Sequence, residues 1–209
     1  PLPTGEIRDY RPADMISKAS PFDYSRAATC QRWEEFLNEV LVTDQGKPDA
    51  DLVAYVQRLI GYGLTGHTSE QLFAVLYGRG GNGKGVFVET IKEVLGRYAK
   101  ATPFETFEMK PAGGISNDIA GLHGARIVLA SEGEAGRPMA EATIKRLTGG
   151  DTISARFLRR EFFEFRPEFL ILLLTNHKPS FRGQDAGLWR RVKLIPFIRS
   201  YEGDTNRDP

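Results

Sequence analysis

The feature that most constrains the fold is a glycine-rich segment between a short apolar run and an amphipathic stretch. The run 72–77 is almost continuously apolar, as expected for a strand buried on both faces of a parallel sheet. The stretch after the glycines has apolar residues at helical spacing, which predicts a helix from Gly85. Strand, glycine turn and helix together predict a loop whose backbone N–H groups cradle a triphosphate, with Lys84 on the β- and γ-oxygens.

This pattern of glycines and lysine is weak by itself, because a plain glycine-rich turn also matches it, and the flanking strand and helix favour nucleotide binding. One position departs from the pattern. The residue after Lys84 is ordinarily Ser or Thr, whose hydroxyl holds Mg²⁺, and here it is Gly85. We therefore expect weakened metal binding, and loss of hydrolysis stays open. The residues expected to bind nucleotide are Gly78, Arg79, Gly80, Gly81, Asn82, Gly83, Lys84, Gly85 and Val86.

Further buried strands and helices are predicted downstream of the loop. Apolar runs at 127–130, 169–174 and 192–197 indicate strands, and the pattern over 139–147 indicates a helix. Alternating strands and helices predict an α/β fold with a central, mostly parallel sheet flanked by helices. Between 153 and 165, two short apolar stretches flank a polar tip, which predicts a β-hairpin.

The chain is predicted to contain four regions. Residues 1–24 are polar and rich in proline, as in a linker or a lightly docked arm. Residues 25–68 carry two helical stripes, which predict a small helical module whose end is marked by turns at Gly61, Gly63 and Gly66. The main domain is expected over 69–200 and a truncated linker over 201–209.

Composition excludes several classes of protein. The net charge of +1 provides no global basic field, so any nucleic-acid contact must come from a local patch or from pooled subunits. No apolar run reaches the roughly 18 residues that a membrane span requires. Cys30 is the single cysteine, and the histidines have no metal-ligand spacing. We expect a cytoplasmic protein without a membrane segment, and the lack of an initiator methionine suggests a fragment.

Polar residues follow two of the predicted strands. Glu132 and Glu134 follow the strand 127–130, where an acid at the end of a strand next to the loop could orient Mg²⁺ and polarise water. A solvated acidic turn is the alternative. Asn176 follows the strand 169–174, where it could contact the γ-phosphate or the water, or could simply form a turn.

Taken in order, these motifs resemble those of superfamily 3 helicases, specifically the poxvirus and phage/plasmid primase–helicase family. The resemblance extends over residues 25 to about 200 and implies a P-loop ATPase of the AAA+-like type. The matching stretches are Gly61 to Gly66, Gly80 to Lys84, Ser131-Glu132, Ile144 to Asp151 with Ala155-Arg156, Leu174 to Pro179, Trp189 to Val192 and Ile195 to Phe197.

The resemblance implies roles for individual residues. Glu132 would be the principal acid with Mg²⁺, Glu134 a second acid, and Asn176 the sensor of the nucleophile. Arg191 would be an arginine finger that enters the site of a neighbouring subunit, with Arg190 as the second candidate; a surface ion pair is the alternative. ATP and Mg²⁺ are the expected cofactors. A hexameric ring is the expected assembly, and a primase domain on the same full-length chain is a further expectation.

The resemblance also implies single-stranded DNA as a partner, gripped by the hairpin 153–165. Contacts to phosphates carry no sequence information, which suits a motor that steps over any sequence. A solvated basic turn is the alternative, and the aromatic residues Phe157, Phe162, Phe163 and Phe165 are expected in the core. The predicted function is an ATP-dependent DNA helicase core; a nucleotide-gated DNA-binding or scaffold module is the alternative. The expected DNA-binding residues are Lys145, Arg156, Arg159 and Arg160.

Overall fold

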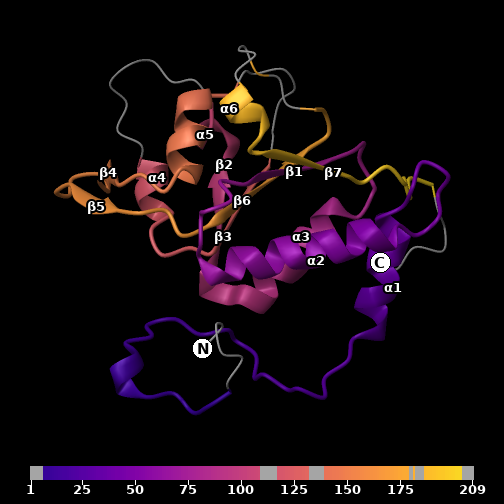
Figure 1. The fold of residues 1–209 in the computed structure, drawn as a ribbon, viewed down its shortest axis with the longest axis horizontal. Helices are drawn as coiled ribbons and strands as arrows, with labels where there is room; N and C mark the ends of the chain where they lie inside the picture. The colour runs from indigo at the N-terminus through magenta and orange to yellow at the C-terminus, as the bar shows by residue number, and fades with distance from the viewer. Residues whose placement is uncertain (1–6, 109–116, 132–138, 179–180, 182–185, 204–209) are drawn as a thin grey trace.

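Five short parallel strands form the central sheet of the computed structural model, which describes residues 7–108, 117–131, 139–178, 181 and 186–203 (Figure 1). The strand order is β2-β3-β6-β1-β7. The α/β fold class and the four predicted strands are therefore confirmed. The bounds are β1 Phe73–Tyr77, β2 Ala99–Pro103, β3 Ile127–Ser131, β6 Leu170–Thr175 and β7 Val192–Pro196.

Strand β2 has no counterpart in the sequence prediction. Its residues, Ala-Lys-Ala-Thr-Pro, form no apolar run. Ala99 and Thr102 are buried, Lys100 is half-buried, and the other two residues are exposed. β2 pairs with β3 alone and lies at the edge of the sheet. An edge strand needs fewer apolar side chains than a central one, so its pattern is weak.

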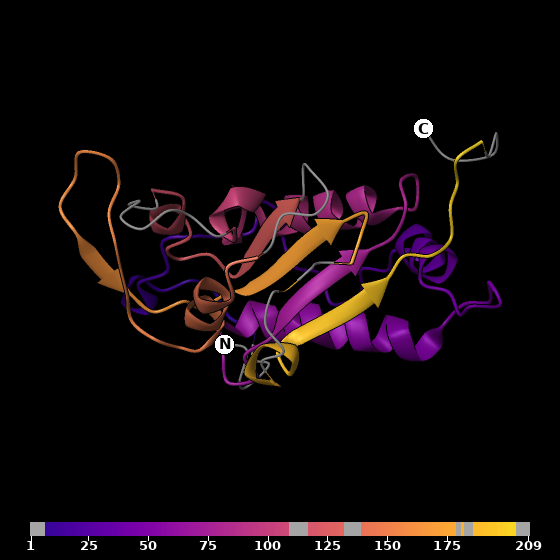
Figure 2. The same ribbon diagram turned by 90° about the horizontal axis from the view of Figure 1, so that it is seen from above.

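Helices cover both faces of the sheet (Figures 1 and 2). Successive residues of a strand point to opposite faces, so the apolar strands present apolar side chains to both helical layers. In β1, Ala74 and Leu76 pack against the first three helices, whereas Phe73 and Val75 belong to the core on the other face. The first layer consists of α1 Gln31–Val40, α2 Ala50–Thr65 and α3 Lys84–Leu95. The second consists of α4 Asn117–Gly121, α5 Glu141–Thr148 and α6 Ala186–Trp189.

Helix α2 continues through two of the glycines that were expected to mark turns. Gly61 and Gly63 both lie inside it, and only Gly66, with φ +76°, ends the helix. A Cβ on Gly63 would lie 2.5 Å from Cδ1 of Ile127. Gly63 therefore lets α2 approach the sheet closely. The prediction of turns at Gly61 and Gly63 was wrong: Gly63 is required for this close packing, and Gly61 lies in the helix with open space around its Cβ position.

Different structures lie at the two ends of the parallel strands, their carboxyl edge and their amino edge. The register pairs Tyr77 with Thr175 and Ser131 with Leu174, so the ends of β1, β3 and β6 meet at one edge. A two-stranded antiparallel hairpin, β4 Ile153–Ala155 and β5 Phe163–Phe165, precedes β6 and projects beyond the opposite edge (Figure 2). The predicted hairpin is confirmed.

The N-terminal segment crosses the outside of the first helical layer (Figure 1). Its described residues include the 3-10 helix η1 Pro12–Asp14. Two further 3-10 helices, η2 Gly96–Tyr98 and η3 Phe104–Thr106, flank β2 in the main domain. The Tyr98 hydroxyl donates to the Lys18 carbonyl (2.8 Å), and the Ser20 hydroxyl donates to the Val94 carbonyl (2.7 Å). Within the described ranges, no helix combines the length and apolarity needed to cross a membrane.

Candidate nucleotide-binding site

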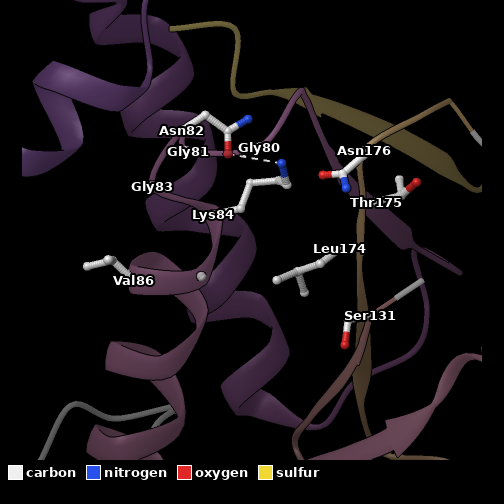
Figure 3. A pocket seen from close by; sticks show the side chains of 11 residues that line it. Gly80, Gly81, Asn82, Gly83, Lys84, Val86, Ser131, Leu174, Thr175 and Asn176 are labelled. Carbon is white, nitrogen blue, oxygen red and sulfur yellow. Dashed lines mark hydrogen bonds between the residues drawn. The ribbon is translucent and has the colours of Figure 1, made fainter. Parts of the chain in front are cut away.

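A pocket of about 380 Å³ opens at the carboxyl edge of the sheet, between the start of α3 and the ends of β3 and β6 (Figure 3). One wall is the glycine loop, from Gly80 to Val86. Gly78 and Arg79, also predicted to bind nucleotide, do not line it, although their carbonyl groups contact Lys84. The facing wall consists of Ser131, Leu174, Thr175 and Asn176.

Lys84 is the first residue of α3, and only 7% of it is exposed. Its Nζ donates to the carbonyl of Gly78 (2.6 Å), to that of Arg79 (3.3 Å) and to Oδ1 of Asn82 (2.9 Å). Burial lowers the pKa of the Lys84 ammonium. These three acceptors match the three N–H donors of the ammonium group, so a bound phosphate must replace at least one of them.

Asn82 connects this lysine to the far strand of the sheet. Its side chain is buried, and its Nδ2 donates to the carbonyl of Phe197, just past the end of β7 (2.7 Å). The segment after β7 returns to the loop, where the Tyr201 N–H donates to the carbonyl of Gly81 (2.7 Å). Sequence reasoning placed Asn82 in the loop but missed this role, because Phe197 and Tyr201 are more than 100 positions away.

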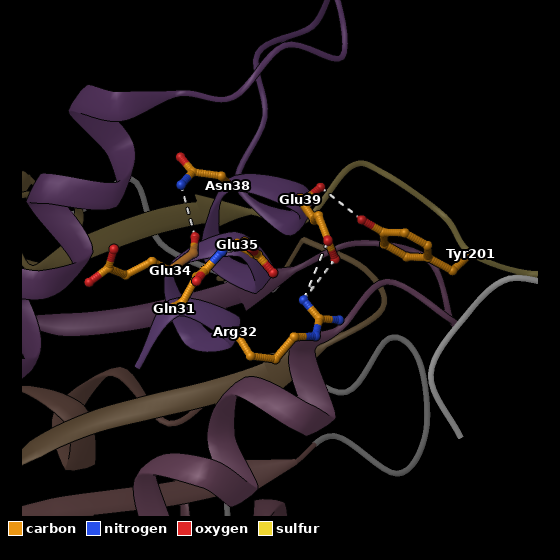
Figure 4. Close-up of polar contacts among 7 residues, drawn as sticks. All are labelled: Gln31, Arg32, Glu34, Glu35, Asn38, Glu39 and Tyr201. Carbon is orange, nitrogen blue, oxygen red and sulfur yellow. Dashed lines mark hydrogen bonds and ion pairs between the residues drawn. The ribbon is translucent and has the colours of Figure 1, made fainter. Parts of the chain in front are cut away.

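Helix α1 supports the loop from behind. Gly83 has φ +85°, and a Cβ there would lie 2.6 Å from Cγ1 of Val40. The Tyr201 hydroxyl donates to the carbonyl of Glu39 (2.9 Å), as Figure 4 shows, so the segment after β7 is attached to the same helix. Helix α1, predicted as part of a small helical module ahead of the main domain, thus packs directly against the glycine loop.

Strand β6, which Asn176 follows, lies between the loop strand β1 and the strand β3 that precedes the predicted acids. β6 pairs with β1 on one side and with β3 on the other. The expectation that the acid-bearing strand would be the neighbour of β1 is therefore wrong, because β6 is inserted between them. Asn176 is exposed beside the loop. Glu132 and Glu134 lie outside the described residues.

The pocket provides neutral oxygen atoms that can contact a magnesium nucleotide, and a bound Mg²⁺ would need the phosphates and water as further ligands. Mg²⁺ takes oxygen ligands and usually retains several waters beside the phosphates. The pocket offers the hydroxyls of Ser131 and Thr175 and the amide oxygen of Asn176. Within the described part of the chain, no group of three or more acidic, histidine or cysteine side chains could hold a metal ion alone. A metal here would be held chiefly through the nucleotide.

Arg190 and Arg191, predicted to enter the site of a neighbouring subunit, lie at the amino edge of the sheet, immediately before β7. The Arg190 side chain is exposed, and its Nη2 donates to Oε1 of Gln71 (3.0 Å). Arg191 is only 7% exposed; it donates to the Gly187 carbonyl, and its Nε has no partner among the described residues. Burial lowers the pKa of Arg191. Neither residue approaches its own chain's pocket, and their role stays a prediction.

The hairpin tip carries three of the four residues predicted to bind DNA. Arg159 and Arg160 are exposed, and the guanidinium of Arg156 lies 4.6 Å from the centre of the Phe162 ring. The expectation that Phe157 and Phe162 belong to the core is wrong: they are 45% and 56% exposed, because the hairpin projects from the body. Lys145 lies apart from the tip, on α5.

The fold and the site together define a P-loop domain of the AAA+-like class, in which a parallel sheet between two helical layers presents a lysine-bearing glycine loop at its carboxyl edge. Residues 76–191 match the model of the family of unknown function DUF5906. Residues 2–42 match the model described as D5 N terminal like.

Viral relatives agree with this class. A protein of Acanthamoeba polyphaga mimivirus named as a helicase, L207/L206, is 33% identical over 202 residues, which cover 96% of this chain and 21% of the relative. A protein of Frog virus 3 (isolate Goorha) named as helicase 022R is 28% identical over 160 residues, covering 74% and 16%. The chain thus spans about a fifth of the length of these relatives or less.

Solved structures share the fold at low sequence identity. The C-terminal region of NrS-1 superimposes with a TM-score of 0.63 at 13% identity, covering 84% of this chain and 39% of that one. The JCV helicase gives 0.52 at 11% identity, covering 84% and 47%. The chain belongs to the DUF5906 family, among the superfamily 3 primase–helicases that its motifs resemble.

Proposed function

We propose that this chain is the ATP-hydrolysing motor core of a DNA helicase that moves along single-stranded DNA as a hexameric ring. The observation that carries the proposal is the pocket in which Lys84 faces Asn176 and Ser131 across the carboxyl edge of the sheet. The helicase names of the viral relatives support the activity. In the full-length protein, a primase domain would lie outside this fragment.

In this proposal, Lys84 and Asn176 act from the pocket walls, and Glu132 and Glu134, which lie outside the described residues, take the roles that the family resemblance implies. Lys84 would exchange the loop carbonyls for the β- and γ-oxygens and neutralise their charge. Asn176 would hold the attacking water through its amide, and Glu132 would take up the proton of that water, with Glu134 as a second acid. Bound ATP with Mg²⁺ would supply the phosphoryl group and the charge compensation for its transfer.

The opposite edge would serve neighbouring subunits and DNA. A finger must reach another protomer's phosphates, and the exposed Arg190 meets this requirement better than the buried Arg191. The family resemblance had instead placed Arg191 first and Arg190 second. Arg156, Arg159 and Arg160 on the hairpin would contact phosphates of the threaded strand. Lys145 would add a contact from α5.

The test is an ATPase assay titrated with single-stranded DNA. We expect turnover that DNA stimulates and that falls by about a hundredfold in Lys84→Ala, since one preorganised cation on the phosphates is lost. Lys92→Ala is the matched control, because Lys92 lies on the same helix but pairs with Glu89 at the surface (2.9 Å). Unchanged turnover in Lys84→Ala would show that the site is misassigned.

A second function is favoured by one specific observation, the missing hydroxyl at Gly85. In that case the chain would bind nucleotide and use it to gate DNA binding, without hydrolysis. The same assay separates the two functions. DNA-bound rings that bind ATP with Lys84-dependent affinity but release no phosphate would favour the gate over the motor.

A further inference from the structure

The absence of a hydroxyl at Gly85 is not imposed by packing. Gly85 is the second residue of α3, exposed at the pocket wall, and a Cβ built there would meet no atom within 4 Å. By contrast, Gly83 two positions earlier has left-handed backbone and a Cβ position that Val40 already occupies. A serine would therefore fit at position 85, and the pocket must obtain a hydroxyl ligand for its metal elsewhere or do without one.

The facing wall offers two hydroxyl groups, and one of them is already engaged. The Thr175 hydroxyl donates to the carbonyl of His177 (2.6 Å) and accepts from the His177 N–H (3.0 Å), so it shapes the turn after β6. Ser131, the last residue of β3, is exposed at the pocket, and its hydroxyl makes no hydrogen bond to the described residues. Its hydroxyl is the one available to a ligand.

We infer that Ser131 supplies the hydroxyl ligand to the divalent cation of the bound nucleotide, in place of the Ser or Thr that ordinarily follows the loop lysine. The inference rests on the proposed function, because it requires a magnesium nucleotide in this pocket. A hydroxyl on β3 is the same neutral oxygen donor as one on α3, so the charge of the site is unchanged. The metal would then be held from the strand side of the pocket and not from the helix.

The test is a set of four proteins: the unmodified chain, Ser131→Ala, Gly85→Ser, and the double variant. Isothermal calorimetry with a non-hydrolysable ATP analogue, in EDTA and over a Mg²⁺ titration, measures how much the metal strengthens nucleotide binding. We expect Ser131→Ala to lower this enhancement by roughly tenfold and to leave the affinity in EDTA unchanged. Gly85→Ser should restore the enhancement in the double variant, because it returns a hydroxyl from the helix side.

Three outcomes would overturn the inference: an unchanged enhancement in Ser131→Ala, an equal loss of affinity in EDTA, or no recovery in the double variant. If Ser131→Ala fails to fold, the pair Ser131→Thr and Ser131→Val replaces it. These two side chains have the same shape and differ in the hydroxyl, so only Ser131→Thr should keep the metal enhancement.

The same data separate this inference from the proposed function. If the unmodified chain binds no analogue with or without Mg²⁺, the proposed function fails and the inference with it. If binding requires Lys84 but the metal enhancement is independent of Ser131, only the inference fails.

Discussion

Within the glycine loop, individual residues differ in what they do, although the sequence presents them as one motif. Lys84 already uses its donors on loop oxygens, and Asn82 holds that arrangement to the segment after β7 through a 2.7 Å bond. The lysine and its role in the loop could be predicted from local spacing. The part played by Asn82 could not, because its partner Phe197 is brought to the loop by the sheet.

Two glycines of the loop give a prediction at the same scale. Gly83→Ala should lower the free energy of unfolding by about 1–2 kcal/mol from the backbone alone, because φ is +85°, and by more if Val40 cannot move. Gly85→Ala, in a helix and with open space around the new Cβ, should raise it by up to about 1 kcal/mol. Urea unfolding of both variants measures the difference.

Nucleotide affinity provides the second readout for these variants. Gly83→Ala should weaken binding of an ATP analogue, since the loop can no longer rest against α1, and Gly85→Ala should not. Equal stability of the two variants would show that the left-handed conformation of Gly83 is not required.

Among the elements, the strands that carry a continuous apolar run were predictable, and the order in which they pair was not. The runs at β1, β3 and β6 reflect burial on both faces, which the local sequence records. β7 is an edge strand like β2, but it keeps the apolar residues Val192, Leu194 and Ile195, so its pattern could still be recognised. β2 left no such record because this edge strand, Ala-Lys-Ala-Thr-Pro, contains no large apolar residue. That β6 separates β1 from β3 depends on pairing between distant segments, for which residue spacing contains no signal.

For the β4–β5 hairpin, too, the strands were predictable from the sequence and their surroundings were not. Its two strands were predicted from two short apolar stretches around a polar tip, whereas the exposure of Phe157 and Phe162 was not predicted. Aromatic residues are buried in most folds, so composition favours the core. Only the projection of the hairpin beyond the sheet places these rings in solvent, beside the arginines of the tip.

A prediction follows for DNA binding by this element. Arg159→Ala and Arg160→Ala should each weaken binding of single-stranded DNA to a similar extent for any base sequence, and reduce the salt dependence of the logarithm of the binding constant by about 0.7 per lost phosphate contact. Fluorescence anisotropy with labelled oligonucleotides at several salt concentrations measures both quantities. Arg58→Ala, on the exposed side of α2, is the control and should change neither.

An equal loss of affinity in Arg58→Ala would indicate that a diffuse charge, and not the hairpin, binds the strand. Unchanged affinity and salt dependence in both hairpin variants would contradict the proposed contact.

In the molecule as a whole, those predicted catalytic residues that the structure describes separate into two groups at opposite edges of one sheet. Lys84 and Asn176 line the pocket at the carboxyl edge, and Arg190 and the hairpin lie at the amino edge. A strand of five residues spans about 17 Å, which is too far for Arg190 to reach its own pocket. This geometry suits a site that two subunits share.

Mixing of subunits tests the shared site. Arg190→Ala alone should bind nucleotide normally and turn over about 10³-fold more slowly, because a finger acts on the transition state. Mixed with Lys84→Ala subunits, which are inactive for a different reason, it should regain part of the activity. Each mixed interface can then combine an intact lysine with an intact arginine, and steady-state phosphate release measures the recovery.

Arg191→Ala is the comparison variant. Because Arg191 is buried, we expect its loss to lower the free energy of unfolding, which thermal unfolding measures, and Arg190→Ala should leave stability nearly unchanged. If mixed rings assemble but show no recovery of turnover, Arg190 does not act in a neighbouring site.

Spacing along the chain was enough to predict the P-loop, most of the strands beside it, the hairpin and the class of protein, because each depends on residues close together in the chain or on motifs in a recognisable order. The tertiary structure alone decided that β6 lies between β1 and β3, that Arg191 is buried while Arg190 is exposed, and that Ser131 faces Gly85 across one pocket. Each of these depends on which distant segments pack together, and packing is a property of the folded chain that local spacing does not encode.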